Sequence, residues 1–387
     1  MSKIKVNEIS KHDASEITVN DTVKIDTIAE KTSGAGVTVD GLTIKDTGFD
    51  EPVKMKGYTT SQINSLSGMG AGDTVYDSDL GTLKVYNGTS WNAMSNSTFP
   101  FTVEWLIVAG GGSGGADDNS VGAGGGAGGL RNSYASENTG GGASGETPHS
   151  LFSGTNYAVT IGAGAAAVLT QNESSGNQGS SSSFNSVSTV GGGAGAAYAS
   201  SGSAVQGGTG GSGGGSAGWN YTNDATTAGG AGTSGQGYAG GSYTGGGGGR
   251  AGGGGGGASA VGANADTSTA GNGGAGLASS ITGSSVTYAG GGGGAGDGGS
   301  GAGGSGGGGA GSMTGGTDGT ANTGGGGGGT GGSSGTLSGA GGSGVVILRY
   351  PSTAGVITIS SGLTASTATD GDYKVTTITA GTGNVSW

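Results

Sequence analysis

The chain contains no cysteine and only 4 prolines in its 387 residues. Without cysteine it can form neither disulfides nor thiolate metal sites, and so little proline excludes a collagen-like triple helix. Hydrophobic residues make up 31% of the chain and aromatic residues 5%, which is too little for one large globular core. We therefore expect stability to be distributed along an elongated molecule.

Positive charge and long apolar runs are also scarce. The chain has 13 Lys and Arg against 25 Asp and Glu, a net charge of −12, which argues against nucleic acid as a partner. No stretch approaches the roughly 20 apolar residues of a membrane span, and residues 1–8 lack the apolar region of a signal peptide. These features predict a protein assembled in the cytoplasm, without membrane insertion.

Catalytic patterns are missing as well. The two histidines, His12 and His149, lie far apart in the sequence, and we expect both at the surface. Matches to Gly-x-Gly-x-x-Gly occur by chance and outside any βαβ context, and no Gly-Lys-Ser/Thr phosphate loop exists. The Asp117-Asp118 pair is typical of turn carboxylates. We predict that the chain is not an enzyme and has no cofactor or metal.

What the sequence does contain is glycine: 104 residues, most of them between Gly110 and Gly344. Such a composition is common in disordered chains. Ordering about a hundred glycines costs on the order of 50 to 100 kcal/mol relative to alanine, which backbone hydrogen bonds at roughly 0.5 to 1.5 kcal/mol each offset only if nearly all form. Polyproline-II-type helices, with three residues per turn and outward-pointing N–H and C=O groups, meet this condition when glycine lets them pack closely.

The segments that frame the glycine region favour an ordered bundle over disorder. Residues 104–109 and 345–350 are short, apolar, β-branched runs typical of buried strands. Further strand-like segments lie at residues 157–161, 183–190 and 285–289. A flexible linker would not need them. We predict a mainly β and irregular fold in which residues 101–350 form a bundle of polyglycine-II helices.

Short β modules flank this region on both sides. Residues 1–56 alternate β-type runs with turns about every ten residues, which predicts a β region that intertwines with copies of itself. Residues 57–100 predict a β-hairpin module with a threonine-capped helix near Tyr58 and a turn at Asn87-Gly88. Residues 351–387 predict a C-terminal β unit. Its expected strands are 356–359, 372–379 and 383–387, with a turn at Asp370-Gly371.

Three of these segments resemble structural proteins of tailed bacteriophages. Residues 23–41 and the hairpin at 72–91 are similar to segments of phage fibre proteins. Residues 105–112, Trp-Leu-Ile-Val-Ala-Gly-Gly-Gly, together with 344–350, resemble the glycine-rich domain of phage adhesins, whose known members pack polyglycine-II helices. The resemblance implies a virion appendage, often a homotrimer, released by lysis. It would bind a host surface glycan or outer-membrane protein, and residues 1–56 would attach it to other virion or tail proteins.

If the glycine helices form a rigid scaffold, the loops that interrupt it are the places for binding groups. Residues 217–224 combine an indole, a phenol and amides, which suit sugar stacking and hydroxyl recognition. The candidate receptor-binding residues are Trp219, Asn220, Tyr221, Asn223, Asp224, Tyr238 and Tyr243. These aromatics could instead cover the scaffold or seal contacts between chains. The functional alternatives are a structural head fibre or decoration protein of the virion, and a non-viral glycine-rich filament or ice-binding protein.

Overall fold

The structure is a computed structural model. It describes residues 57–94, 100–118, 120–170, 175–198, 205–219, 226–244, 249–267, 269–332 and 334–387. The chain divides into two compact units, residues 1–91 and 92–387, and is mainly β, as predicted. The expected N-terminal β region, residues 1–56, lies outside the described residues.

The described part of the first unit is a four-stranded sheet with one short helix. The strands are β1 (Gly57–Tyr58), β2 (Thr74–Asp77), β3 (Thr82–Tyr86) and β4 (Trp91–Ala93), in that order across the sheet. Helix α1 (Thr60–Asn64) begins after Thr59, whose hydroxyl accepts from the Gln62 N–H at 3.2 Å while the Thr59 N–H donates to the Gln62 side chain at 2.9 Å. This reciprocal capping box confirms the predicted threonine cap.

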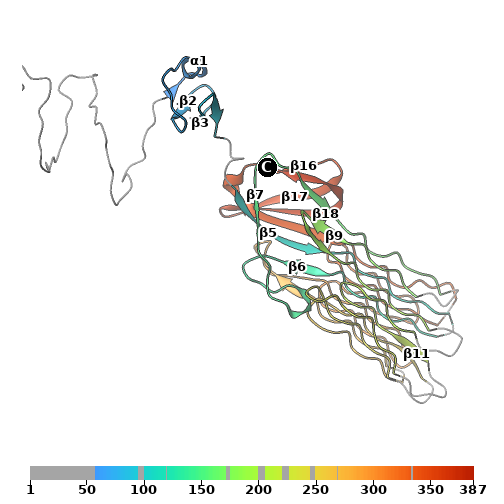
Figure 1. Cartoon of the computed structure of the whole chain (residues 1–387). Coiled ribbons are helices and arrows are strands. Elements are labelled where there is room, and N and C mark those ends of the chain that lie inside the picture. The colour runs from blue at the N-terminus through green and yellow to red at the C-terminus, as the bar shows by residue number, and fades with distance from the viewer. Residues whose placement is uncertain are drawn as a thin grey trace, which may run out of the picture. The chain divides into compact units, whose positions relative to one another are not determined.

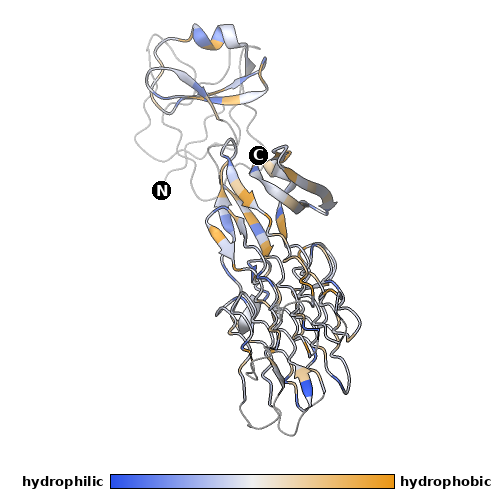
Figure 2. Cartoon of the chain, turned by 90° about the vertical axis from the view of Figure 1, so that its right-hand side faces the viewer, coloured by the Kyte–Doolittle hydropathy of each residue, from blue (hydrophilic) through white to orange (hydrophobic). Residues whose placement is uncertain are grey.

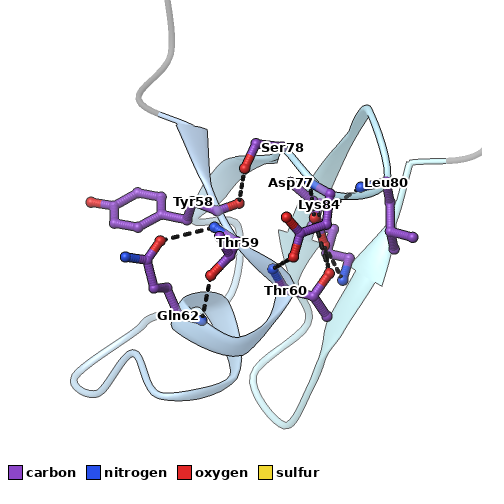
Figure 3. Close-up of polar contacts among 9 residues, drawn as sticks. Tyr58, Thr59, Thr60, Gln62, Asp77, Ser78, Leu80 and Lys84 are labelled. Carbon is purple, nitrogen blue, oxygen red and sulfur yellow. Dashed lines mark hydrogen bonds and ion pairs between the residues drawn. The ribbon is translucent and has the colours of Figure 1, made fainter.

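A single buried carboxylate links the helix to the sheet in this unit (Figure 3). Asp77 forms an ion pair with Lys84 at 2.7 Å and accepts from the Thr60 hydroxyl at 2.8 Å. It also accepts from the backbone N–H groups of Asp79 and Leu80. The hydrogen bond from Lys84 is the main cause that lowers the pKa of Asp77 to about 2, so this carboxylate stays charged at neutral pH.

The predicted Asn87-Gly88 turn joins β3 to β4. The Asn87 side-chain oxygen accepts from the N–H groups of Thr89 at 2.9 Å and Ser90 at 2.8 Å, and Gly88 has a φ of 98°. Asparagine supplies a side-chain acceptor and glycine the positive φ that this tight reversal requires. The hairpin prediction is confirmed.

The second unit contains a ten-stranded sheet (Figure 1). Its strands are β5 (Phe101–Val108), β6 (Leu130–Asn132), β7 (His149–Leu151), β8 (Tyr157–Thr160), β9 (Ser182–Phe184), β10 (Val187–Thr189), β15 (Val345–Pro351), β16 (Thr358–Ile359), β17 (Leu363–Asp370) and β18 (Tyr373–Ser386). The main order is β10-β9-β8-β18-β15-β5-β6, with β7 paired to β5 and with β16 and β17 paired to β18. The two apolar runs expected to frame the glycine region are thus neighbours, with Val345 opposite Val108.

Strands β5 and β15 are buried on both faces. Trp105 and Leu348 belong to a cluster on one side, and Leu106 and Ile347 to a cluster on the other. Because neither face meets solvent, the sequence of these strands is continuously apolar rather than alternating. The C-terminal Trp387 packs on the first cluster.

Two expectations about strands were wrong. Residues 183–190, predicted as one strand, form the hairpin of β9 and β10, in which Asn185 adopts a φ of 53°. Residues 372–379 and 383–387, predicted as separate strands, belong to the single strand β18 of 14 residues. Strand β17 was not predicted, because its Thr, Ala and Ser residues carry no apolar pattern.

Between β5 and β15 the chain runs back and forth in extended, glycine-rich segments that lie side by side (Figure 1). We call this array the glycine bundle. Two short hairpins interrupt it, β11 (Ala217–Trp219) with β12 (Arg250–Gly252) and β13 (Leu277–Ser279) with β14 (Val286–Tyr288). Two 3₁₀ turns, η2 (Gly140–Gly142) and η3 (Ser352–Ala354), complete the unit. Within this unit the strongly apolar residues gather in the ten-stranded sheet, and the bundle is pale in Figure 2.

Hydrogen bonds in the bundle repeat every three residues along the chain. In segment 109–115 the acceptor changes at each residue and returns to the same neighbour three residues later. Gly110 and Ser113 donate to segment 177–180, Gly111 and Gly114 to segment 339–342, and Gly112 and Gly115 to segment 123–126, at 2.9 to 3.0 Å. The backbone therefore points its donors in three directions in turn.

An interior segment has six neighbours. Segment 123–129 donates to segments 190–196, 253–256 and 324–327, and it accepts from segments 109–115, 212–215 and 292–295. A Cβ atom on Gly125 would overlap the carbonyl group of Gly112. Glycine is required here because the neighbouring backbones lie closer than any side chain allows.

Candidate functional site

The glycine bundle has two ends, and only one carries the ten-stranded sheet (Figure 1). We call the other, marked by β11, the distal end. Bridges between single residues tie neighbouring segments together there, including Gly122 with Ala197, Val205 with Ala217, Ala251 with Gly296, and Leu169 with Leu337. Chain reversals beyond these bridges are therefore held on a hydrogen-bonded support.

An ion pair anchors one part of the distal end. Arg250 Nε lies 2.8 Å from Asp297 Oδ2, and the two side chains are about one third exposed. Arg250 is also directly opposite Trp219 in the β11–β12 pair. An ion pair this exposed contributes at most about 1 kcal/mol, so it fixes geometry more than it adds stability.

The structure separates the predicted receptor-binding residues. Trp219 ends β11 at the distal end, whereas Tyr238 lies near the sheet end, with its hydroxyl beside Gly142. Asn220, Tyr221, Asn223 and Asp224 lie outside the described residues.

Tyr243 is at the distal end, but its side chain is fully buried. The Tyr243 ring lies against Gly218, where a Cβ atom would overlap it. Its hydroxyl donates to the Gly249 carbonyl at 3.0 Å, and its backbone N–H donates to the Thr227 carbonyl at 2.9 Å. Tyr243 therefore packs inside the support of the loops, next to the strand that ends in Trp219.

The Arg250–Asp297 pair was not predicted. Arg250 is one of two arginines in the glycine region, so its presence was visible in the sequence. Its partner lies 47 residues further on, and no local pattern links two positions across a backbone-packed bundle. The other arginine, Arg131, pairs with Glu146 at the sheet end.

A second group of charges surrounds Arg349 at the sheet end. Its guanidinium lies 2.9 Å from an Asp370 oxygen and 3.7 Å from a Glu104 oxygen, and it sits 3.8 Å from the Tyr373 ring centre. Two clefts of about 470 and 520 Å³ adjoin this group and share Glu104 in their linings. The ion pairs hold the charged groups in fixed positions between the clefts.

His149, expected at the surface, is partly buried instead. Its ring stacks on Trp105 with centroids 5.7 Å apart and meets the edge of Phe184 at 5.6 Å. Burial lowers the pKa of His149, opposed by the charge of Glu146. This histidine is therefore a neutral packing residue.

Two further searches cover only the residues that the structure describes. Among them no group of three or more His, Cys, Asp or Glu side chains is placed to hold a metal ion. None of their helices is long and apolar enough to span a membrane.

The backbone-packed bundle, its closing strand pair and its distal reversals define a class of protein: a glycine-rich scaffold that carries loops. The chain belongs to the glycine-rich domain family, whose profile matches residues 85–351. That match ends with strand β15, so it includes both strands that close the bundle. No curated protein and no solved structure matches the chain.

Proposed function

We propose that the chain is a virion appendage of a tailed bacteriophage, a tail fibre or tip adhesin that binds the host surface through its distal loops. The observation that carries this proposal is the division of labour in the bundle. Its interior offers almost no side chains, whereas the distal end presents Trp219 and Arg250 on a hydrogen-bonded support. Loops on a rigid scaffold are where binding groups usually lie, and the resemblance of residues 23–41 and 72–91 to phage fibre proteins supports the virion assignment.

The extended segments of the bundle, in this proposal, are polyglycine-II helices. Support comes from the three-residue repeat of acceptors and from the six neighbours of segment 123–129. A helix with three residues per turn and no internal hydrogen bonds directs its backbone groups outward at equal steps, which generates this pattern.

The remaining parts of the proposal rest on the resemblance. Residues 1–56 attach the protein to other virion or tail proteins and help it to assemble as a homotrimer. The assembled protein resides in the virion and leaves the host by lysis. Its ligand is a host surface glycan or an outer-membrane protein, and it performs no catalysis.

Adsorption of phage particles to host cells tests the proposal. We expect replacement of residues 220–224 by a Gly-Ser segment of equal length to lower the adsorption rate at least about tenfold, the factor that corresponds to a loss of 1.4 kcal/mol of binding. Ser284→Ala, an exposed change in the β13–β14 turn, serves as the control. Unchanged adsorption with normal particles would instead favour a structural head fibre or decoration protein.

A further inference from the structure

The first unit leaves one face of its sheet uncovered in the described part. Tyr76 lies directly opposite Leu83 in the β2–β3 register, and Thr74 lies opposite Val85. Side chains two residues apart on a strand point to the same side, so these four residues share a face, which we call the Tyr76 face. Tyr76 is 39% and Leu83 38% exposed.

The opposite face of the same sheet cannot stabilise the unit by itself. Helix α1 covers it through the hydrogen bond from Thr60 to Asp77. The buried apolar residues in the described part of this unit are Ile63 and Val75, beside the ion pair of Asp77 and Lys84. Two apolar side chains bury far too little surface to offset the entropy of ordering residues 57–91.

Small units usually solve this problem with disulfides, a metal ion or association. The chain has no cysteine, and the residues described in this unit contain no cluster suited to a metal ion. Additional burial must therefore come from a surface laid over the exposed one. The Tyr76 face is the place for it, because it is apolar and no charged residue belongs to it.

We propose that the Tyr76 face packs against the same face of a second copy of this chain. A unit that needs cover whenever it is folded needs a partner that is always present, and its own copies meet that condition. Interfaces between identical chains are also more apolar than those with transient partners, which matches a face of Thr, Tyr, Leu and Val. The inference gives a surface to the self-association proposed above and does not depend on host binding.

Disulfide trapping tests this contact in the full-length chain. Because the chain lacks cysteine, an introduced thiol is unique. We expect Leu83→Cys to form a disulfide-linked dimer on mild oxidation, with a yield that does not change on dilution of the protein. Asn64→Cys is the matched control, since it places an exposed thiol on α1, on the other side of the sheet, and we expect it to stay monomeric on a non-reducing gel.

Tyr76→Cys is a second probe, in case a disulfide at position 83 has poor geometry. Both changes are at exposed positions, and an unchanged circular dichroism spectrum verifies folding. The proposal is refuted if neither variant forms a disulfide or if Asn64→Cys forms one equally well. A chain that sediments as an oligomer while both face variants stay unlinked would keep the proposed self-association and place it elsewhere.

Discussion

At the scale of single residues, the absence of a side chain is what the glycine bundle depends on. Gly125 lies against the Gly112 carbonyl, and its own N–H donates to Gly327 at 2.8 Å. A methyl group at this position has to push a neighbouring backbone away and lengthen hydrogen bonds on several sides. The stabilising element here is the close approach of peptide groups, so removing a hydrogen atom's worth of space matters more than adding apolar surface.

We therefore predict that Gly125→Ala lowers the free energy of unfolding by about 1 to 3 kcal/mol, the usual cost of overpacking. The gain in helix propensity that alanine gives elsewhere does not apply to this extended backbone. Chemical denaturation monitored by circular dichroism measures the change. Ala302→Ser, at an exposed position of the bundle, should leave stability unaltered, and equal stability of the two variants would contradict the close-packing argument.

Asp77 gives a prediction about pH in the first unit. Its pKa in the folded state is about 2, against a model value of 3.8, with Lys84 as the main cause. A carboxyl group whose pKa is depressed by folding adds stability above its unfolded pKa and loses it as pH falls. The stabilising effect of Asp77 should therefore be complete above about pH 4 and vanish as pH falls toward 2.

Thermal unfolding of the wild type and of Asp77→Asn between pH 6 and pH 2 measures this effect. We expect the variant to be less stable at pH 6, because Lys84 loses its buried partner, and the difference to shrink as pH approaches 2. A difference that stays constant over this range would show that the charge of Asp77 does not matter.

At the scale of elements, local chemistry was visible in the sequence and long-range pairing was not. The Thr59 cap, the Asn87-Gly88 turn and the strands around Trp105 and Ile347 were predicted because each depends on neighbouring residues or on a continuous apolar run. Strand β17 was missed because small polar residues on an exposed strand have no distinctive period.

The candidate site shows the same limit. Trp219 was predicted from its side-chain chemistry, and the structure places it at the distal end. The burial of Tyr243 could not be foreseen, because it depends on Gly218 lying beside its ring. In a bundle whose segments pair through backbone atoms, side chains carry little information about which segments meet.

Trp387 provides a test of how the ten-stranded sheet is closed. Its ring lies 5.2 Å from Phe101 and 5.1 Å from Tyr350, both measured between ring centres, and its carbonyl accepts from the Gly154 N–H at 2.8 Å. We predict that Trp387→Ala destabilises the second unit by about 3 kcal/mol, the lower end for removal of a large aromatic side chain, because Trp387 is partly exposed.

Near-ultraviolet circular dichroism during denaturation measures the effect of this change. Trp387→Phe keeps an aromatic ring in the cluster and is expected to recover most of the lost stability. A variant lacking the ring that unfolds like the wild type would mean that Trp387 covers the sheet without contributing to its closure.

At the scale of the whole second unit, the order of the bundle comes from a backbone repeat of three residues. The N–H groups of Gly326 and Gly329 donate to one neighbouring segment, at Gly290 and Gly293, and a partner at the same angle recurs only after three residues. An inserted residue therefore rotates every following donor by one step of the repeat, whereas three inserted residues restore the original directions. A conventional core would not respond in this way, since side chains, rather than peptide groups, define its register.

Insertions between Gly327 and Gly328 test this difference, because these residues lie in a run of glycines. We predict that one added glycine destabilises the bundle more than three added glycines do, although the longer insertion adds more chain to be ordered. Three residues move the following segment by one full repeat and let each N–H find an equivalent acceptor, and the excess is taken up at the distal reversal. Thermal unfolding and amide hydrogen exchange compare the variants. If the loss of stability simply grew with the length of the insertion, side-chain contacts rather than the three-residue backbone repeat would set the register of the bundle.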